Sequence, residues 1–72
     1  MKNIDALVAD GGEITIGSVD SVECAATAAD AHNCLAILIR RENETLTALL
    51  RRLDKALKSA MDGGNIIDEL NR

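Results

Sequence analysis

An apolar stripe over residues 46–61 constrains the fold of this chain more than any other feature. Its members recur with the 3.6-residue period of an amphipathic helix; they are Leu46, Leu49, Leu50, Leu53, Leu57, Ala60 and Met61. The spacing predicts one long helix over about residues 44–61, with Asn43 as its N-cap and Gly63-Gly64 at its end. The short segment 65–72 is too short for a second stable helix, so the stripe must be covered by something else.

Residues 13–41 are expected to supply the strands that cover it. The segment 13–18 alternates apolar and polar residues, as a half-buried strand does. Residues 21–31 are rich in Ala and could be helical by propensity, but the turn formers Asp30 and Asn33 favour a hairpin with strands at about 21–28 and 34–41. The predicted fold class is therefore α+β: a small antiparallel meander of two or three strands packed on one long amphipathic helix.

The two ends of the chain belong to the same single domain, which we expect to span residues 1–72. Residues 1–12 form a short helix or a loose arm, stopped by Asp10-Gly11-Gly12. Residues 65–72 form a tail that docks on its own domain or is swapped with that of another copy.

The strand at 34–41 is apolar on both of its faces. Alternation places Cys34, Ala36 and Leu38 on one side and Leu35, Ile37 and Ile39 on the other. A strand of this kind is normally covered on both sides. We expect the long helix to cover one face, and another subunit or the N-terminal arm to cover the other.

Composition points in the same direction, because the 72-residue chain has no Phe, Tyr or Trp and a hydrophobic fraction of 47% that includes many Ala. Such a core buries little apolar area for each residue that folding must order. The sequence therefore predicts a homodimer. Its core and interface residues are expected to be Leu35, Ile37, Ile39, Leu46, Leu50, Leu53 and Leu57.

Charge is segregated along the chain, whose net charge is −4. Basic residues dominate the segment 40–58, while both flanking segments are acidic. The candidate patch for an acidic protein partner is Arg40, Arg41, Arg51 and Arg52. The other interpretation, which the charges favour more, is that these cations neutralise the acidic segments within the fold or across a dimer.

Net negative charge argues against general binding to nucleic acid or anionic lipid. The chain nevertheless shares a strand followed by an arginine-bearing helix with the ribbon-helix-helix DNA-binding regulators. The alternative function is therefore that of a transcriptional regulator of this type. That fold needs a longer second helix and polar side chains on its strand, which residues 35–39 do not offer. No run of 18 apolar residues and no basic leader is present, so we expect a cytoplasmic protein without a membrane segment.

No motif in the sequence predicts chemistry. His32 could act as a general base held by Asp30, but a solvated turn histidine is the favoured interpretation. Cys24 and Cys34 are expected to be small buried apolar side chains and not metal ligands or a disulfide. In the predicted hairpin, residue i pairs with residue 63 − i, which places Cys24 opposite Ile39 and not opposite Cys34.

The remaining polar and glycine pairs fit structural roles. Gly11-Gly12 and Gly63-Gly64 lack a phosphate-loop pattern and are expected to be turn and cap glycines. The acidic pairs Glu42/Glu44 and Asp68-Glu69 lack calcium-loop spacing and are expected to lie on a solvated surface. The sequence predicts no catalytic residue, no metal and no cofactor. It favours a non-enzymatic protein-interaction module.

Residues 35–41 (Leu-Ala-Ile-Leu-Ile-Arg-Arg), the helical run 49–57 (Leu-Leu-Arg-Arg-Leu-Asp-Lys-Ala-Leu) and the closing Asp68-Glu69-Leu70-Asn71 resemble short bacterial and prophage-borne proteins of no assigned activity. In that pattern a strand ending in two arginines leads through a Pro-Gly turn into a helix; here Glu42-Asn43 replace Pro-Gly. The resemblance covers about residues 30–72. It implies a strand-turn-helix module and a prophage-like origin, with a host factor as the protein that it modulates.

Overall fold

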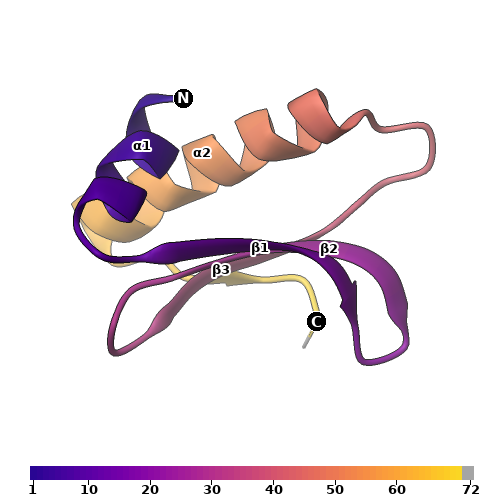
Figure 1. The fold of residues 1–72 in the computed structure, drawn as a ribbon, viewed down its shortest axis with the longest axis horizontal. Coiled ribbons are helices and arrows are strands. Elements are labelled where there is room, and N and C mark those ends of the chain that lie inside the picture. Colours follow the sequence, from indigo (N-terminus) through magenta and orange to yellow (C-terminus); the bar gives the residue numbers. More distant parts are fainter. Residues whose placement is uncertain (71–72) are drawn as a thin grey trace.

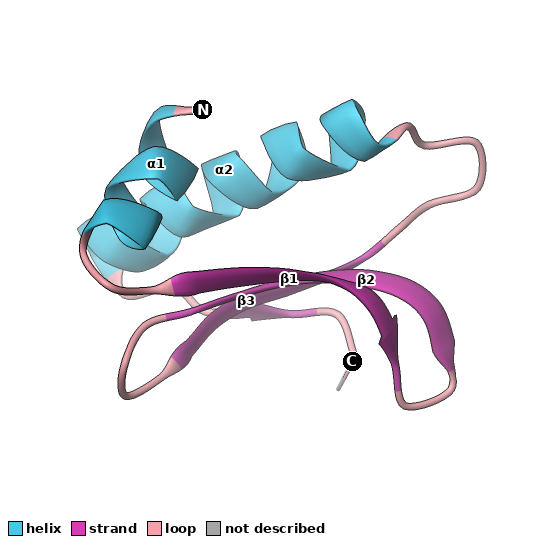
Figure 2. Cartoon of the chain, viewed as in Figure 1, coloured by secondary structure: helices cyan, strands magenta, loops and turns pink. Residues whose placement is uncertain are grey.

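The computed structural model describes residues 1–70, which form two helices and one four-stranded sheet (Figure 2). The elements follow one another as α1 (Lys2–Ala9), β1 (Glu13–Val19), β2 (Val22–Ala29), β3 (Cys34–Ile39), α2 (Leu46–Gly63) and β4 (Ile67–Asp68). The α+β class is confirmed, as is the assignment of residues 22–29 to a strand. The N-terminal segment is a helix and not a loose arm.

The sheet has the order β1-β2-β3-β4. Its first three strands are the antiparallel meander expected from the sequence. The fourth strand, β4, pairs in parallel with β3 through Ala36–Ile67 and Ile37–Asp68. The sheet is therefore mixed and larger than predicted, and the C-terminal segment docks on its own domain; residues 71 and 72 lie outside the described part.

Both helices lie over the same face of the sheet (Figure 1). Leu49, Leu53 and Leu57 of α2 are fully buried against the alanines of β2 and β3, whose small methyl groups let the helix approach the strands closely. Leu7 of α1 joins the same core. The expectation that the N-terminal arm could cover the second face of the sheet is therefore wrong, since α1 packs beside α2 and not opposite to it.

The predicted alternation along β3 is confirmed where the strand is regular. Ala36 and Leu38 are buried in the core under the helices, while Ile37 and Ile39 are half-buried. Near the start of β3 a β-bulge interrupts the pairing with β2, and Leu35 also packs against the core.

The predicted hairpin register holds at Ala29–Cys34 and is shifted by one residue from Ala28–Ala36 onward. Ala25, and not Cys24, lies opposite Ile39, because the bulge adds a residue to one strand. Cys34 is exposed and Cys24 is half-buried, so the prediction of two buried cysteines is wrong for Cys34. Both thiols are free.

The helix α2 begins at Leu46, the first member of the apolar stripe, and not at the predicted residue 44. Thr45, and not Asn43, is the N-cap, with its Oγ1 accepting a hydrogen bond from the backbone N–H of Ala48 at 3.1 Å. Asn43 instead sits in the turn closed by the Glu44 N–H and the Arg41 carbonyl, with φ of 64°. That left-handed position is the one Gly takes in a Pro-Gly turn, and Asn tolerates it better than most residues.

The amino end of α2 is less buried than predicted, while its carboxyl end matches the prediction. Its amino end rises away from the sheet (Figure 1), which leaves Leu46 51% exposed and only half-buries Leu50. Within one copy Leu46 therefore does not pack in the core, and its predicted place in a dimer interface stays a prediction. At the other end Gly64 adopts the predicted left-handed cap, with φ of 71°.

Substituting Gly12 with Ala is expected to destabilise the protein by roughly 1–3 kcal/mol. A Cβ at this position would lie 2.5 Å from Cδ1 of Leu7 and 2.9 Å from the backbone oxygen of Ala29, and the backbone contact has no way to relax cheaply. Gly63→Ala is the control, because its Cβ would meet only the flexible amide of Asn65 at 3.1 Å. Chemical denaturation followed by circular dichroism should show a lower midpoint for Gly12→Ala alone; equal midpoints for the two variants would contradict the packing described here.

Candidate functional site

A basic surface lies over the first half of α2 and the loop that precedes it. We define it by Arg41, Arg51 and Lys55, which are exposed. Within residues 1–70, none of these three side chains forms an ion pair. Arg51 and Lys55 are four residues apart on α2, so the helical repeat brings them to one face.

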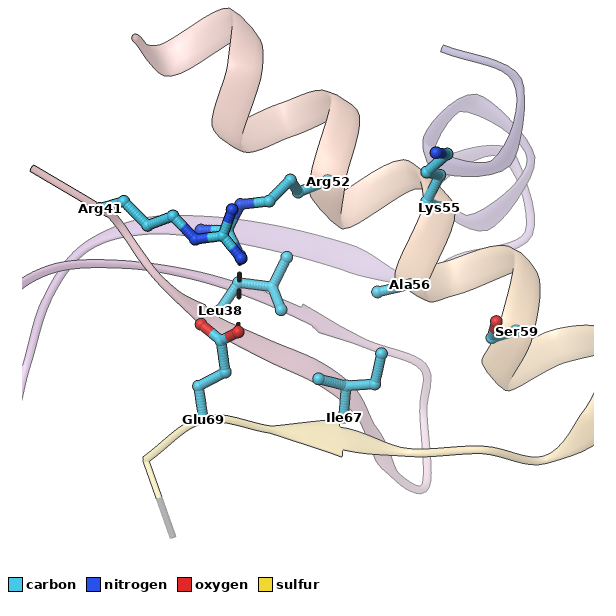
Figure 3. A pocket seen from close by; sticks show the side chains of 8 residues that line it. All are labelled: Leu38, Arg41, Arg52, Lys55, Ala56, Ser59, Ile67 and Glu69. Atoms are coloured by element: carbon cyan, nitrogen blue, oxygen red, sulfur yellow. Dashed lines mark hydrogen bonds and ion pairs between the residues drawn. The ribbon is translucent and has the colours of Figure 1, made fainter. Parts of the chain in front are cut away.

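Two hollows flank this surface. The first, of about 310 Å³, has an apolar floor and a polar rim (Figure 3); it is lined by Leu38, Arg41, Arg52, Lys55, Ala56, Ser59, Ile67 and Glu69. The second, of about 420 Å³, lies toward the N-terminus and is lined by Met1, Arg51, Arg52, Asp54 and Lys55. Cations on the rim and aliphatic side chains on the floor suit an anionic group attached to an apolar body.

Arg52 joins the segments that surround the first hollow. Its Nε donates to Oε2 of Glu44 at 2.7 Å, and its Nη2 donates both to Oε1 of Glu44 and to the carbonyl of Ile39, each at 2.9 Å. Its Nη1 lies 3.4 Å from Oε2 of Glu69. One guanidinium therefore ties the loop before α2, the end of β3 and the C-terminal segment to the helix.

The carboxylates of this network are sheltered from solvent, with side-chain exposures of 8% for Glu44 and 18% for Glu69. Hydrogen bonds from the Arg52 side chain and from the Arg41 backbone lower the pKa of Glu44 from 4.5 to about 2. The prediction that Glu44 and Glu69 lie on a solvated surface is therefore wrong. Arg52 lies 13 residues from Ile39 and 17 residues from Glu69 along the chain, so a local sequence pattern does not display these contacts.

Because the pKa of Glu44 is lowered in the folded protein, its ion pair should stabilise the fold fully above about pH 4.5 and lose this effect as the pH falls toward about 2. The urea midpoint of the wild type should exceed that of Glu44→Gln at neutral pH, and the difference should shrink across this interval. Asp30 and Asp54, whose pKa values are also lowered, are present in both proteins and do not alter the comparison. A difference between midpoints that stays constant down to the acid end would contradict the assignment.

Asp54 lies within the basic face of α2 but has a structural partner. Burial raises its pKa, yet hydrogen bonds from the backbone N–H of Ile4 and from Asn3 outweigh this and hold the pKa below its ordinary value. Its Oδ1 accepts from the N–H groups of Asn3 and Ile4, both at 2.9 Å. The carboxylate thus caps the first turn of α1, which explains why α1 packs beside α2.

The structure gives the arginines of the predicted patch different roles. Arg41 and Arg52 line the first hollow, and Arg51 and Arg52 line the second. Arg52 is engaged inside the fold, as the neutralising interpretation expected, and Nε of Arg40 donates to the carbonyl of Glu44 at 2.7 Å. Lys55, which borders both hollows, was missed in the predicted patch, although its spacing of four residues from Arg51 was a usable signal.

The remaining candidates take structural positions. His32 lies exposed in the β2–β3 turn, where Oδ1 of Asp30 accepts from the N–H groups of His32 and Asn33 at 2.8 and 2.7 Å. Both bonds lower the pKa of Asp30, and the bond from the His32 backbone has the larger effect on it. They also fix the turn predicted from the sequence. Among residues 1–70, no group of three or more His, Cys, Asp or Glu is placed to hold a metal ion.

Comparison of the chain with protein-family models, with curated proteins and with solved structures gave no match. The resemblance drawn from residues 35–41 and 49–57 thus gains no support from these comparisons. Neither helix in residues 1–70 has the length and apolar character needed to cross a bilayer.

Proposed function

We propose that the protein is a non-enzymatic interaction module that binds an acidic segment of a partner protein through the basic surface. The observation that carries the proposal is the gathering of Arg41, Arg51 and Lys55, without ion-pair partners in residues 1–70, beside two hollows. In a chain of net charge −4, a local positive surface directs acidic partners to one place on the molecule.

A non-enzymatic role is supported by the position of the residues that could do chemistry. His32 lines neither of the two hollows and lies in an exposed turn. Cys24 and Cys34 line neither hollow as well. Apart from the exposed hydroxyl of Ser59, the groups that line them are cations, apolar side chains, and carboxylates already bonded to cations or backbone.

The alternative, a DNA-binding regulator of ribbon-helix-helix type, has less support. In that fold a strand pairs with the strand of a second subunit and a second helix follows the first. Here β3 pairs with β2 and β4 of its own chain, and the segment after α2 contains β4 in place of a helix. The acidic net charge also opposes binding to phosphates.

The homodimer expected from the sequence stays part of the proposal. The leucines of α2 are largely sheltered within one copy, so a second copy would have to cover the sheet face opposite the helices, where Ile37 and Ile39 are half-buried. Sedimentation equilibrium at low micromolar concentration should give a dimer; a stable, cooperatively folded 7.7 kDa monomer would contradict this part. If the prophage-like origin is correct, the acidic partner is a host factor.

The basic surface is tested with a fluorescein-labelled octaglutamate peptide followed by anisotropy. Arg51→Ala/Lys55→Ala is expected to bind the peptide at least about tenfold more weakly than the wild type, since each removed cation contributes to attraction. Ser18→Glu/Ser21→Glu lowers the net charge equally at exposed positions of the β1–β2 hairpin and should bind like the wild type. Arg52 is left intact because it supports the fold.

Two results would overturn the proposal. One is equal weakening by both double variants, which would mean that net charge alone governs binding. The other is tight, salt-sensitive binding of a DNA duplex by the wild type together with no binding of octaglutamate, which would favour the nucleic-acid alternative.

A further inference from the structure

We infer that the edge of β3, which the C-terminal segment of the same chain occupies, is a binding site for an extended segment of a partner protein carrying an apolar residue two positions before an acidic one. The C-terminal segment, residues 65–70, would then hold the site closed until the partner replaces it. This inference rests on the proposed function, because it specifies the acidic partner that the basic surface attracts.

The bound C-terminal segment displays the chemistry of the site. Ile67 lies opposite Ala36 and lines the first hollow together with Leu38 and Ala56 (Figure 3). Two positions later, the backbone N–H of Glu69 donates to the carbonyl of Ile37 at 2.9 Å.

The carboxylate of Glu69 completes the recognition. Its Oε1 accepts from the N–H of Ile39 at 2.7 Å, and its Oε2 lies 3.4 Å from Arg52, the contact drawn as a dashed line in Figure 3. A side chain thus replaces the backbone acceptor that a longer strand would offer to Ile39. The site therefore combines an apolar position, strand pairing and a carboxylate position.

The strand pairing that holds the C-terminal segment is short. Its strand β4 contains only two residues, and a strand this short adds little pairing of its own. Ile66, just before it, is 52% exposed. The segment follows Gly63 and Gly64 at the end of α2. Because glycine accepts most backbone conformations, a change of the Gly64 dihedral angles can move the segment off β3 at little cost in backbone strain.

A partner can gain contacts that the C-terminal segment does not make. Arg41 and Lys55 line the same hollow and have no ion-pair partner within residues 1–70, and the hydroxyl of Ser59 lies on the same wall. Because Ile67 lines this hollow of about 310 Å³, we expect a larger apolar side chain in its place to extend into the hollow. A partner segment with a second carboxylate would satisfy these cations, and this additional attraction lets it compete with an intramolecular occupant.

The test uses a fluorescein-labelled peptide with the sequence of residues 64–70 and the full-length protein. Glu69→Ala should bind this peptide at least about tenfold more tightly than the wild type, because its own segment competes less well. Glu23→Ala changes the net charge equally at an exposed position of β2 and should bind like the wild type. Peptides in which Ser replaces the second Ile, or Gln replaces Glu, should bind Glu69→Ala at least about tenfold more weakly than the parent peptide.

The outcomes separate this inference from the proposed function. If octaglutamate binding depends on Arg51 and Lys55 but the substituted peptides bind as tightly as the parent, charge alone recruits the partner and the β3-edge site is wrong. If the peptide binds Glu69→Ala no better than the wild type, the C-terminal segment does not close the site. If the wild type is a dimer and Glu69→Ala is a monomer, the site binds the C-terminal segment of a second copy. That result would overturn the inference that the site binds a different protein.

Discussion

Leu53→Ala should lower the free energy of unfolding by about 2–5 kcal/mol, which places it among the largest effects expected from a single truncation in this protein. Leu53 is fully buried at the middle of α2, within the core that joins this helix to β2 and β3. The alanines opposite it are too short to move into the space that its side chain would leave. A domain of this size has only a few kcal/mol of stability in total, so the variant should be partly unfolded at room temperature.

Leu46→Ala is the matched control. It makes the same change on the same helix at a side chain that is 51% exposed, and alanine also favours the helix, so the expected loss is under about 1 kcal/mol. Far-UV circular dichroism in urea measures both, since a chain without Trp or Tyr has no intrinsic fluorescence to follow. Similar losses for the two variants would mean that the amino end of α2 packs on the sheet, contrary to the structure.

Arg52→Met should cost about 1–3 kcal/mol of stability despite the similar length of the two side chains. The substitution leaves the sheltered carboxylates of Glu44 and Glu69 without their shared cation, and leaves the carbonyl of Ile39 without its donor. It should also release the C-terminal segment, so amide exchange at Glu69 should become faster.

Arg51→Met removes the same charge from the neighbouring position, where the side chain is exposed and makes no ion pair within residues 1–70. Its urea midpoint should stay close to that of the wild type. If both variants lost the same stability, the effect would come from general charge balance and not from the bonds that Arg52 makes.

The parts of the fold that follow from local sequence were predicted well. The stripe from Leu49 to Ala60 has the period of a helix, and Asp30 with Asn33 marks the β2–β3 turn by a mechanism that acts within four residues. Gly64 ends α2 in the left-handed conformation that glycine adopts readily. Each of these features depends on neighbours along the chain, which a single sequence displays.

The N-cap was misassigned within one short segment, and the other errors arise where distant segments decide the outcome. Asn43 resembles an N-cap in sequence, but the turn after Arg41 needs a residue that accepts positive φ, and Thr45 caps the helix instead. Leu46 matches the apolar period, yet the helix axis carries it past the sheet. The side of the sheet on which α1 lies depends on Asp54, some fifty residues later, which no local pattern indicates.

The same limit applies to the candidate site. The sequence identified a basic segment and the arginines within it, because charge can be counted along the chain. The sequence could not predict which of these arginines lack an ion-pair partner within the fold. Arg52 pairs with Glu69, and the segment that carries Glu69 was predicted to dock either in cis or in trans. Only the folded arrangement distinguishes Arg52, which supports the fold, from Arg41, Arg51 and Lys55.

The two edges of the sheet also bear on how the protein avoids forming fibrils. Along residues 35–39 the β3 edge is wholly aliphatic, and in the described structure β4 and the Glu69 carboxylate shield it. With that side covered, the edges of the sheet are β1 and the two-residue β4, so β1 is the longer edge open to strand addition, and growth at one edge stops at a pair. Loss of the docked segment would leave two open edges, and the chain could then polymerise as an amyloid-like ribbon.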